Sequence, residues 1–234
     1  MPIKLSIKNL ASFALADNCP RCAWVKHLLG YKIPYAIFPG VFSTIDSHCK
    51  KICDLHYSAF DKLPQWLETR FPGFKPLKAP HYTKMVLKLG EIETRGSTDY
   101  ILEKDGELVV IDNKTAHFKD ADDPLAALYD FQLNACGMAL EANGHGKVKS
   151  LHLVYYDPIK LDADRSLPIT GDKPSLEFEV KIRDVALDVG LVERTAAEAV
   201  KVLSQTKAPS GVAGCKDCAQ LGVLLAAANS GGLK

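Results

Sequence analysis

Two short pairs of cysteines lie near opposite ends of the 234-residue chain, in Cys19-Pro-Arg-Cys22 and Cys215-Lys-Asp-Cys218. Two thiolates at this spacing can hold one metal ion, and two such pairs supply the four sulfurs of a tetrahedral site suited to zinc or an iron–sulfur cluster. A shared site would fasten the two ends of the chain together. The alternatives are two unrelated pairs of ordinary cysteines and a redox motif, although neither pair lies in a thioredoxin-like βαβ setting. The remaining cysteines lack a second close partner and are expected to be dispensable for metal: Cys49, Cys53 and Cys136.

Two aspartates and a lysine in the middle of the chain form a second set of chemically capable residues. β-Rich segments flank Asp105-Gly106, which is a strong signal for a two-residue hairpin turn. That turn places Asp99 opposite Asp112, and Lys114 projects from the same face of the hairpin. Opposed like charges are destabilising, and a divalent cation such as Mg²⁺ would relieve the repulsion. The alternative is an incidental acid pair on a solvent-facing hairpin.

A cation held by this acid pair could bridge a phosphate oxygen and a water, which Lys114 would position or deprotonate. Gln132 supports this hypothesis because it lies on the apolar, inward-facing stripe of a predicted helix. Leu128 precedes it by four residues and Cys136 follows it by four. A buried amide needs hydrogen-bond partners. An active-site water, a metal ligand or a phosphate could supply them, and so could the backbone of a neighbouring strand.

The elements that must position these residues follow from periodicity and turn signals. The pattern predicts one α/β domain over residues 1–234 with a mixed central sheet. Its core spans about 80–205, and the cysteines bring together a helical segment, 1–75, and a tail, 206–234. The predicted helices cover 20–32, 43–60, 124–142 and 188–204, with a brief turn near 66–71. The predicted strands cover 84–89, 96–103, 108–114, 151–156 and 175–185.

Composition excludes several classes of protein. With 47% hydrophobic and 24% charged residues, the chain can bury a substantial core, which rules out wholesale disorder. No apolar run approaches the roughly 18 residues that a membrane-spanning helix needs. The first residues also lack the pattern of a secretory signal, so we expect a cytoplasmic protein with reduced thiols.

The net charge of +1 hides an asymmetry, because residues 1–90 carry a net +8 and residues 91–234 a net −7. A basic first third is suited to binding a polyanion such as nucleic acid. The alternative is a solvated basic face that complements the acidic remainder. The candidate DNA contacts are offered as a group: Lys26, Lys32, Lys50 and Lys51.

Three motifs taken together resemble those of a known enzyme family. They are Gly96-Ser-Thr-Asp99, then Ile111-Asp112-Asn-Lys114, and then the segment that begins Gln132-Leu-Asn-Ala within the predicted helix 124–142. In this order they resemble the PD-(D/E)XK nuclease superfamily, most closely its RecB-like branch, which includes the CRISPR-associated exonucleases with an iron–sulfur cluster. The two cysteine pairs also look like the cysteines that bracket the nuclease core there. The resemblance spans roughly residues 10–220.

The resemblance implies a restriction-endonuclease-like fold and a role for each site residue. Asp99 and Asp112 would bind Mg²⁺ or Mn²⁺, Lys114 would be the catalytic lysine, and Gln132 would lie near the substrate strand. A further metal ligand is implied on an early helix, with Asp46 as the first candidate and His48 or His56 as alternatives. The sequence departs from the family at Cys136, where a tyrosine is expected. It also departs in its cysteines, because it has two near each end, whereas the CRISPR-type cluster commonly uses one N-terminal and three C-terminal cysteines. The resemblance implies a [4Fe–4S] cluster, with Zn²⁺ as the alternative.

The function implied is a metal-dependent DNA nuclease that hydrolyses phosphodiester bonds by attack of a metal-bound water. The resemblance favours an exonuclease on single-stranded or end-containing DNA, with a nucleic-acid-processing protein as a candidate partner and no role at a membrane. Two rival functions remain at this point. One is a non-catalytic nucleic-acid-binding or scaffold subunit with a structural metal, and the other is a cysteine redox protein.

Overall fold

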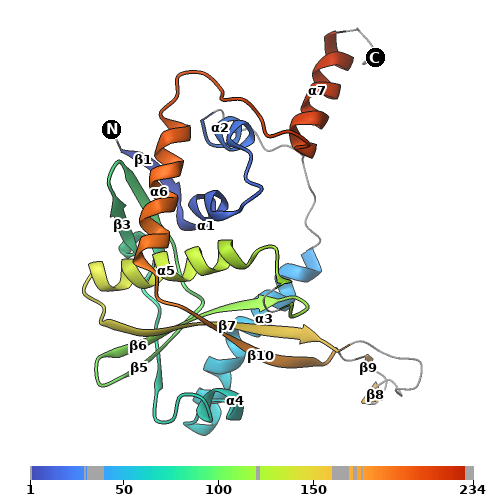
Figure 1. Cartoon of the computed structure of the whole chain (residues 1–234). Coiled ribbons are helices and arrows are strands. Elements are labelled where there is room, and N and C mark those ends of the chain that lie inside the picture. The colour runs from blue at the N-terminus through green and yellow to red at the C-terminus, as the bar shows by residue number, and fades with distance from the viewer. Residues whose placement is uncertain are drawn as a thin grey trace.

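A five-stranded sheet is the centre of the computed structural model, which describes residues 2–28, 30, 40–119, 122–159, 169–170, 173–174 and 176–229 (Figure 1). The strand order is β10-β7-β6-β5-β2, and only the β6–β7 pair is parallel. The bounds of these strands are β2 (Lys75–Leu77), β5 (Tyr100–Lys104), β6 (Glu107–Thr115), β7 (Lys147–Pro158) and β10 (Phe178–Val185). The sheet is therefore mixed, as the sequence predicts.

A second, smaller sheet has the order β1-β4-β3, in which β1 runs parallel to β4 and β3 runs antiparallel to it. Its strands are β1 (Ile3–Ser6), β3 (Val86–Leu89) and β4 (Ile92–Arg95), and a short pair, β8 (Ile169–Thr170) and β9 (Lys173–Pro174), lies apart. Neither β1 nor β4 was predicted. The predicted strand 96–103 proves to be a loop followed by β5, and the predicted strand 84–89 begins as a 3₁₀ turn, η2 (Tyr82–Lys84).

Helices cover both faces of the central sheet. The helices are α1 (Ile7–Ala11), α2 (Pro20–Leu28), α3 (Gly40–Phe60), α4 (Gln65–Glu68), α5 (Ala126–Ala142), α6 (Val189–Leu203) and α7 (Lys216–Asn229), with a 3₁₀ turn, η1 (Ser12–Ala14), after α1. In Figure 1, α5 lies along one face and α3 and α4 lie against the other. Helices α1, α2 and α6 form a further layer on the far side of α5, and α7 projects beside α2.

Two hydrophobic clusters separate these layers, because alternate residues of each strand point to opposite faces. One cluster joins the sheet to α5, α1 and α6 through residues such as Val110, Phe131 and Leu153. The other joins the opposite face to α3 and α4 through residues such as Ile111 and Leu67. Strand β6 is buried on both faces, which explains its run of consecutive apolar residues. The parallel pairing of β6 with β7 requires a crossover, and α5 supplies it.

The predicted hairpin register is confirmed. Tyr100 pairs with Ile111 and Glu103 with Leu108, so Asp105 and Gly106 occupy the turn. Both turn residues have positive φ, 53° and 81°, as the tight hairpin turn requires. The paired part ends at Tyr100, which leaves Asp99 as the residue immediately before β5.

Most predicted helices are found with shifted ends. Helix α3 starts at Gly40, three residues earlier than predicted, and α6 begins one residue after its predicted start, with Asp188 as N-cap. Helix α5 starts at Ala126, two residues after its predicted start. Asp123 accepts a hydrogen bond from the Leu125 N–H, at 2.9 Å, in the turn that precedes the helix. Among the described residues, no helix combines the length and the apolar character needed to cross a membrane.

Candidate active site and metal centre

Strand β6 positions Asp112 and Lys114 on the face that α5 covers. Asp112 is only 5% exposed, and its carboxylate is ion-paired with the Lys114 ammonium, as the spacing of two residues along a strand allows. From α5, Gln132 directs its amide nitrogen toward Asp112 Oδ1, at 3.5 Å. The ring of Tyr129 lies over the Lys114 ammonium, with 4.1 Å between Nζ and the ring centroid. Three residues predicted from the sequence are thus brought together, and an aromatic residue joins them.

Asp99 reaches the same site from the loop before β5. Its Oδ2 accepts a hydrogen bond from the Asn113 N–H at 3.0 Å, which places it beside β6 as the register predicts. Burial raises the pKa of the Asp99 carboxyl, and the negative charge of Asp112 raises it further, while Lys50 and the Asn113 N–H act in the opposite direction. The two carboxylates are therefore close enough to repel each other electrostatically, and a cation would stabilise the pair.

The loop that carries Asp99 is held by packing and by side-chain hydrogen bonds. A Cβ atom added to Gly96 would lie 2.7 Å from Ile7 Cδ1 and 2.9 Å from Ile7 Cβ. Glycine is needed there because the loop passes directly over the buried side chain of Ile7 in α1. Thr98 then donates a hydrogen bond from Oγ1 to the Ile111 carbonyl at 2.9 Å. The first residue of the Gly96-Ser-Thr-Asp99 motif is thus explained by close packing.

Helix α3 contributes Asp46 and Lys50. Lys50 Nζ lies 2.8 Å from Asp46 Oδ2 and 3.1 Å from Asp99 Oδ1, so it joins the two acids. Of the three candidates for an early-helix ligand, Asp46 is the one connected to the acid pair. His48 is exposed, and His56 has its ring nitrogen Nδ1 2.9 Å from the Lys62 carbonyl oxygen.

The candidate DNA-binding lysines that the structure describes do not share one surface. Lys50, one of the predicted DNA contacts, is ion-paired with Asp46 and Asp99 inside the site. Lys26 is exposed on α2, and Lys51 is exposed on α3. Lys32 lies outside the described residues. A role in DNA binding for the exposed lysines stays a prediction.

Cys136, in α5, occupies the position where the family has a tyrosine. Cys136 is buried, and its Sγ lies 3.5 Å from the Ser97 carbonyl oxygen, so it packs under the Gly96–Asp99 loop. Burial raises the pKa of the Cys136 thiol, with further contributions from Asp112 and Asp99. The aromatic side chain at this site comes from Tyr129, one turn before Gln132. Sequence reasoning missed Tyr129, and the available signal was its spacing of three residues from Gln132 on one helix face.

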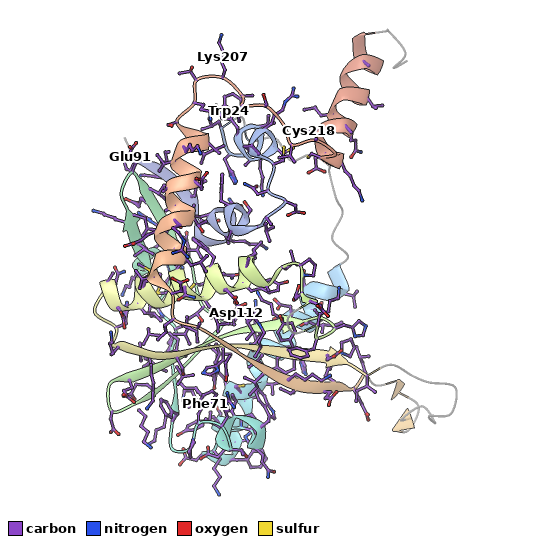
Figure 2. All side chains as sticks on the ribbon, in the orientation of Figure 1. Trp24, Phe71, Glu91, Asp112, Lys207 and Cys218 are labelled. Atoms are coloured by element: carbon purple, nitrogen blue, oxygen red, sulfur yellow. The ribbon has the colours of Figure 1, made fainter. Side chains whose placement is uncertain are left out.

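The four paired cysteines form a separate centre. Figure 2 shows Cys218 beside α2, well away from Asp112 at the sheet. The ligand atoms of Cys19, Cys22, Cys215 and Cys218 all lie within 4.8 Å of one another. Within the described part of the chain, this is the one set of three or more possible metal ligands gathered so closely. The prediction that the cysteines bring the two ends of the chain together is confirmed.

Each cysteine pair opens a helix, which is the local reason for its geometry. The Ala23 N–H bonds to the Cys19 carbonyl, and the Ala219 N–H bonds to the Cys215 carbonyl, so that α2 and α7 both begin at the centre. The partial positive charge of a helix N-terminus favours nearby thiolates. Both helices therefore aim their favourable ends at the same four sulfurs.

The surroundings of the four sulfurs favour the binding of a cation. Burial would raise the pKa of the Cys19 thiol, but hydrogen bonds from the backbone of Cys22 and Val212 and from neighbouring thiols lower it to about 6. Burial and the adjacent thiols raise the pKa of Cys22. Four sulfurs this close cannot all carry a negative charge without a compensating cation. The four cysteines line a cavity of about 710 Å³. The chain at Gly211 passes close to the centre, since a Cβ atom added there would lie 2.9 Å from Cys218 Sγ.

Comparisons with known proteins bear on the identity of the chain. Among curated proteins, none matches the sequence significantly. One of the solved structures that match is a protein described as "Crystal structure of SSO0001", with 14% sequence identity and a TM-score of 0.36, covering 86% of this chain and 76% of that chain. A likeness this weak decides nothing about this chain.

The sequence model of the PD-(D/E)XK nuclease superfamily, in contrast, matches residues 10–222, which include both cysteine pairs and every residue of the acid site. The mixed sheet with helices on both faces agrees with the restriction-endonuclease-like fold that this family implies. The chain belongs to the PD-(D/E)XK nuclease superfamily.

Proposed function

We propose that this protein is a metal-dependent deoxyribonuclease of the RecB-like branch. The observation that carries the proposal is the cluster around Asp112, in which Lys114 pairs with the carboxylate and Gln132 contacts it, inside a chain of the nuclease superfamily. Family membership alone would also suit an inactive, nucleic-acid-binding subunit. An intact acid, lysine and glutamine in contact favours catalysis.

Each residue of the cluster has a distinct chemical task. Carboxylate oxygens are the ligands that Mg²⁺ and Mn²⁺ prefer, and Asp99 and Asp112 would hold such an ion. Bound there, the ion would lower the pKa of a water and offset the charge of the phosphate. Lys114 would orient that water or accept its proton, while Asp112 and the Tyr129 ring restrict where its ammonium can lie. Gln132 would hold its amide toward the substrate strand.

The proposed cleavage can be tested with a variant of Asp112, and a variant of an exposed residue in the same hairpin, Asp105, serves as the control. Asp112→Asn keeps the shape of the side chain but removes its charge, and we expect it to abolish Mg²⁺- or Mn²⁺-dependent cleavage of linear single-stranded DNA. Asp105→Asn changes an exposed turn residue with positive φ, which asparagine tolerates, and should leave cleavage intact. Near-wild-type cleavage by purified Asp112→Asn would refute the assignment. If the wild type binds DNA without cleaving it in either metal, the non-catalytic alternative is correct.

The substrate is proposed to be DNA with free ends, as for the exonucleases that the motifs resemble. Circular single-stranded DNA and the same molecule linearised differ only in their ends. An exonuclease degrades the linear form alone, and products labelled at the 5′ or 3′ end reveal the direction. Cleavage of the circle would indicate an endonuclease, and equal cleavage of an RNA of the same sequence would contradict a preference for DNA.

For the cysteine centre we favour Zn²⁺ over the [4Fe–4S] cluster. The Sγ–Sγ distances are 3.4 Å for Cys22–Cys218, 3.6 Å for Cys19–Cys218 and 3.7 Å for Cys22–Cys215. A tetrahedral zinc with Zn–S bonds of about 2.3 Å holds its sulfurs about 3.8 Å apart. In a [4Fe–4S] cluster each thiolate binds a different iron, so the sulfurs must lie farther apart than around one ion. The spacing of these sulfurs fits one ion.

Anaerobic purification followed by metal analysis and visible absorption tests this assignment. We expect a colourless protein with one zinc, whereas broad absorption in the visible blue with four irons would establish the cluster instead. Cys218→Ser should lose the metal together with much of the thermal stability, because the unfolded chain has no preformed site. Cys49→Ser is the matched control, since Cys49 lies in α3, on the other side of the sheet from α5, and should keep the metal.

A further inference from the structure

Lys50 lies among carboxylates rather than on the open surface. Its ammonium is 2.8 Å from Asp46 Oδ2 and 3.1 Å from Asp99 Oδ1, and its side chain is 37% exposed. The contact with Asp46 is between residues one helical turn apart, but the contact with Asp99 joins α3 to the loop before β5. The Asp99 side chain is 16% exposed, so this second ion pair is partly shielded from solvent.

The charges around the acid site nearly cancel. Three carboxylates, those of Asp46, Asp99 and Asp112, face two ammonium groups, those of Lys50 and Lys114, which leaves a net charge of −1. Each of the two carboxylates proposed to bind metal already contacts a lysine. A divalent cation that binds Asp99 must therefore compete with the Lys50 ammonium, and it would change the charge of the site to +1. A phosphodiester brings one negative charge and restores neutrality.

We propose that Lys50 links metal binding to nucleic-acid binding, by keeping metal affinity low until a phosphodiester enters the site. The inference rests on the proposed function, because it concerns the same acid pair. By linkage, the factor by which a bound phosphodiester tightens metal binding equals the factor by which bound metal tightens phosphodiester binding. A lysine that makes the metal-loaded site positive weakens binding of the metal alone and enlarges that factor. Lys50 is thus a positioning and charge-setting residue, whereas Lys114 is the lysine proposed to orient the attacking water.

A purely structural role for Lys50 predicts something different. If the ion pairs only anchor α3, removing the charge should loosen Asp46 and Asp99 and weaken metal binding. If Lys50 competes with the metal, removing its charge should strengthen metal binding. The two roles therefore predict changes of opposite sign in one measured constant, the affinity for Mn²⁺.

The test measures Mn²⁺ binding by calorimetry in the full-length protein, with and without an uncleavable phosphorothioate single-stranded oligonucleotide. Lys50→Met keeps the aliphatic stem and removes the charge, and Lys62→Met does the same to an exposed lysine just after α3 that is not among the candidate DNA contacts. We expect Lys50→Met to bind Mn²⁺ about tenfold more tightly than wild type without DNA. The oligonucleotide should tighten binding in wild type and Lys62→Met, and much less in Lys50→Met. Lys50→Gln, which keeps a hydrogen-bond donor, serves as the second variant if Lys50→Met does not fold.

The outcomes separate this inference from the proposed function. Unchanged or weaker Mn²⁺ binding in both Lys50 variants would overturn the competition, even if the wild type cleaves DNA. An equal gain in Lys62→Met would also overturn it, because the effect would then be one of general surface charge. If Asp112→Asn binds Mn²⁺ as well as wild type does, the acid pair is not the metal site, and the proposed function fails with it.

Discussion

The close approach of Gly96 to Ile7 allows a quantitative test of how the acid site is held. Gly96→Ala would place a Cβ atom 2.7 Å from Ile7 Cδ1, 2.9 Å from its Cβ and 3.0 Å from its Cγ1. Ile7 is buried in the cluster that joins α1 to the sheet and cannot swing into solvent. Overpacking of this kind typically costs about 1–3 kcal/mol of unfolding free energy. Asp99 lies three residues further on, so the displaced loop should also lower cleavage.

A double-mutant cycle in urea measures whether that contact is the cause. Ile7→Ala alone should cost about 2–5 kcal/mol because it leaves a cavity. It also removes two of the three crowded atoms, so Gly96→Ala should cost at least about 1 kcal/mol less in that background. Gly222→Ala in α7 is the control, since nothing lies within 4 Å of its added Cβ. If Gly96→Ala is as stable as wild type, or if the two changes are strictly additive, the close approach does not position the loop.

Three further predictions follow from other contacts. Gly211→Ala places a Cβ atom 2.9 Å from Cys218 Sγ and should lower the metal content of the purified protein, measured by elemental analysis. Tyr129→Phe should keep at least about half of the wild-type kcat, because the ring over Lys114 remains, whereas Tyr129→Leu should lose about tenfold at equal thermal stability. Burial lowers the pKa of His152, although Asp184 opposes this, so the unfolded chain takes up a proton first as the pH falls. The stability that neutral His152 contributes is complete above its unfolded pKa of about 6.5 and declines below it, and urea melts should show a smaller decline between pH 7 and 5 in His152→Gln.

Turn residues and short-range periodicity predicted those elements whose structure depends on neighbouring residues in the sequence. The β5–β6 hairpin depends on a two-residue turn, so its register and the places of Asp99 and Asp112 could be predicted from sequence. Strands β1 and β4 were missed because each is only four residues long and the two pair across most of the N-terminal half of the chain. The start of α5 was misplaced because Asp123 also accepts a hydrogen bond from the Tyr155 hydroxyl, at 3.2 Å, a contact with β7 that no local pattern reveals.

The same distinction applies to the candidate site. Asp112 and Lys114 share a face through strand alternation, and the sequence was sufficient to pair them. Lys50 was grouped with the candidate DNA contacts because of the basic charge of residues 1–90. Helix α3 packs on the opposite side of the sheet from α5, and only the folded chain brings the Lys50 ammonium to Asp99. Asp46 precedes Lys50 by four residues, and this spacing predicts an ion pair within the helix. The spacing gives no information about the contact between Lys50 and Asp99.

The two centres are connected through packed helices and not through a shared ligand. The cysteines join α2 to α7, and α2 is tied to the end of α6 by the Trp24 indole N–H, which donates to the Gln205 carbonyl at 2.9 Å. Helix α6 packs on α5, which carries Gln132 and Tyr129 over Asp112. Asp112 itself is fixed by β6, inside the sheet. Metal loss at the cysteines should therefore loosen the outer layer first, and reduce cleavage by lowering the stability of α5 rather than by changing the acid pair.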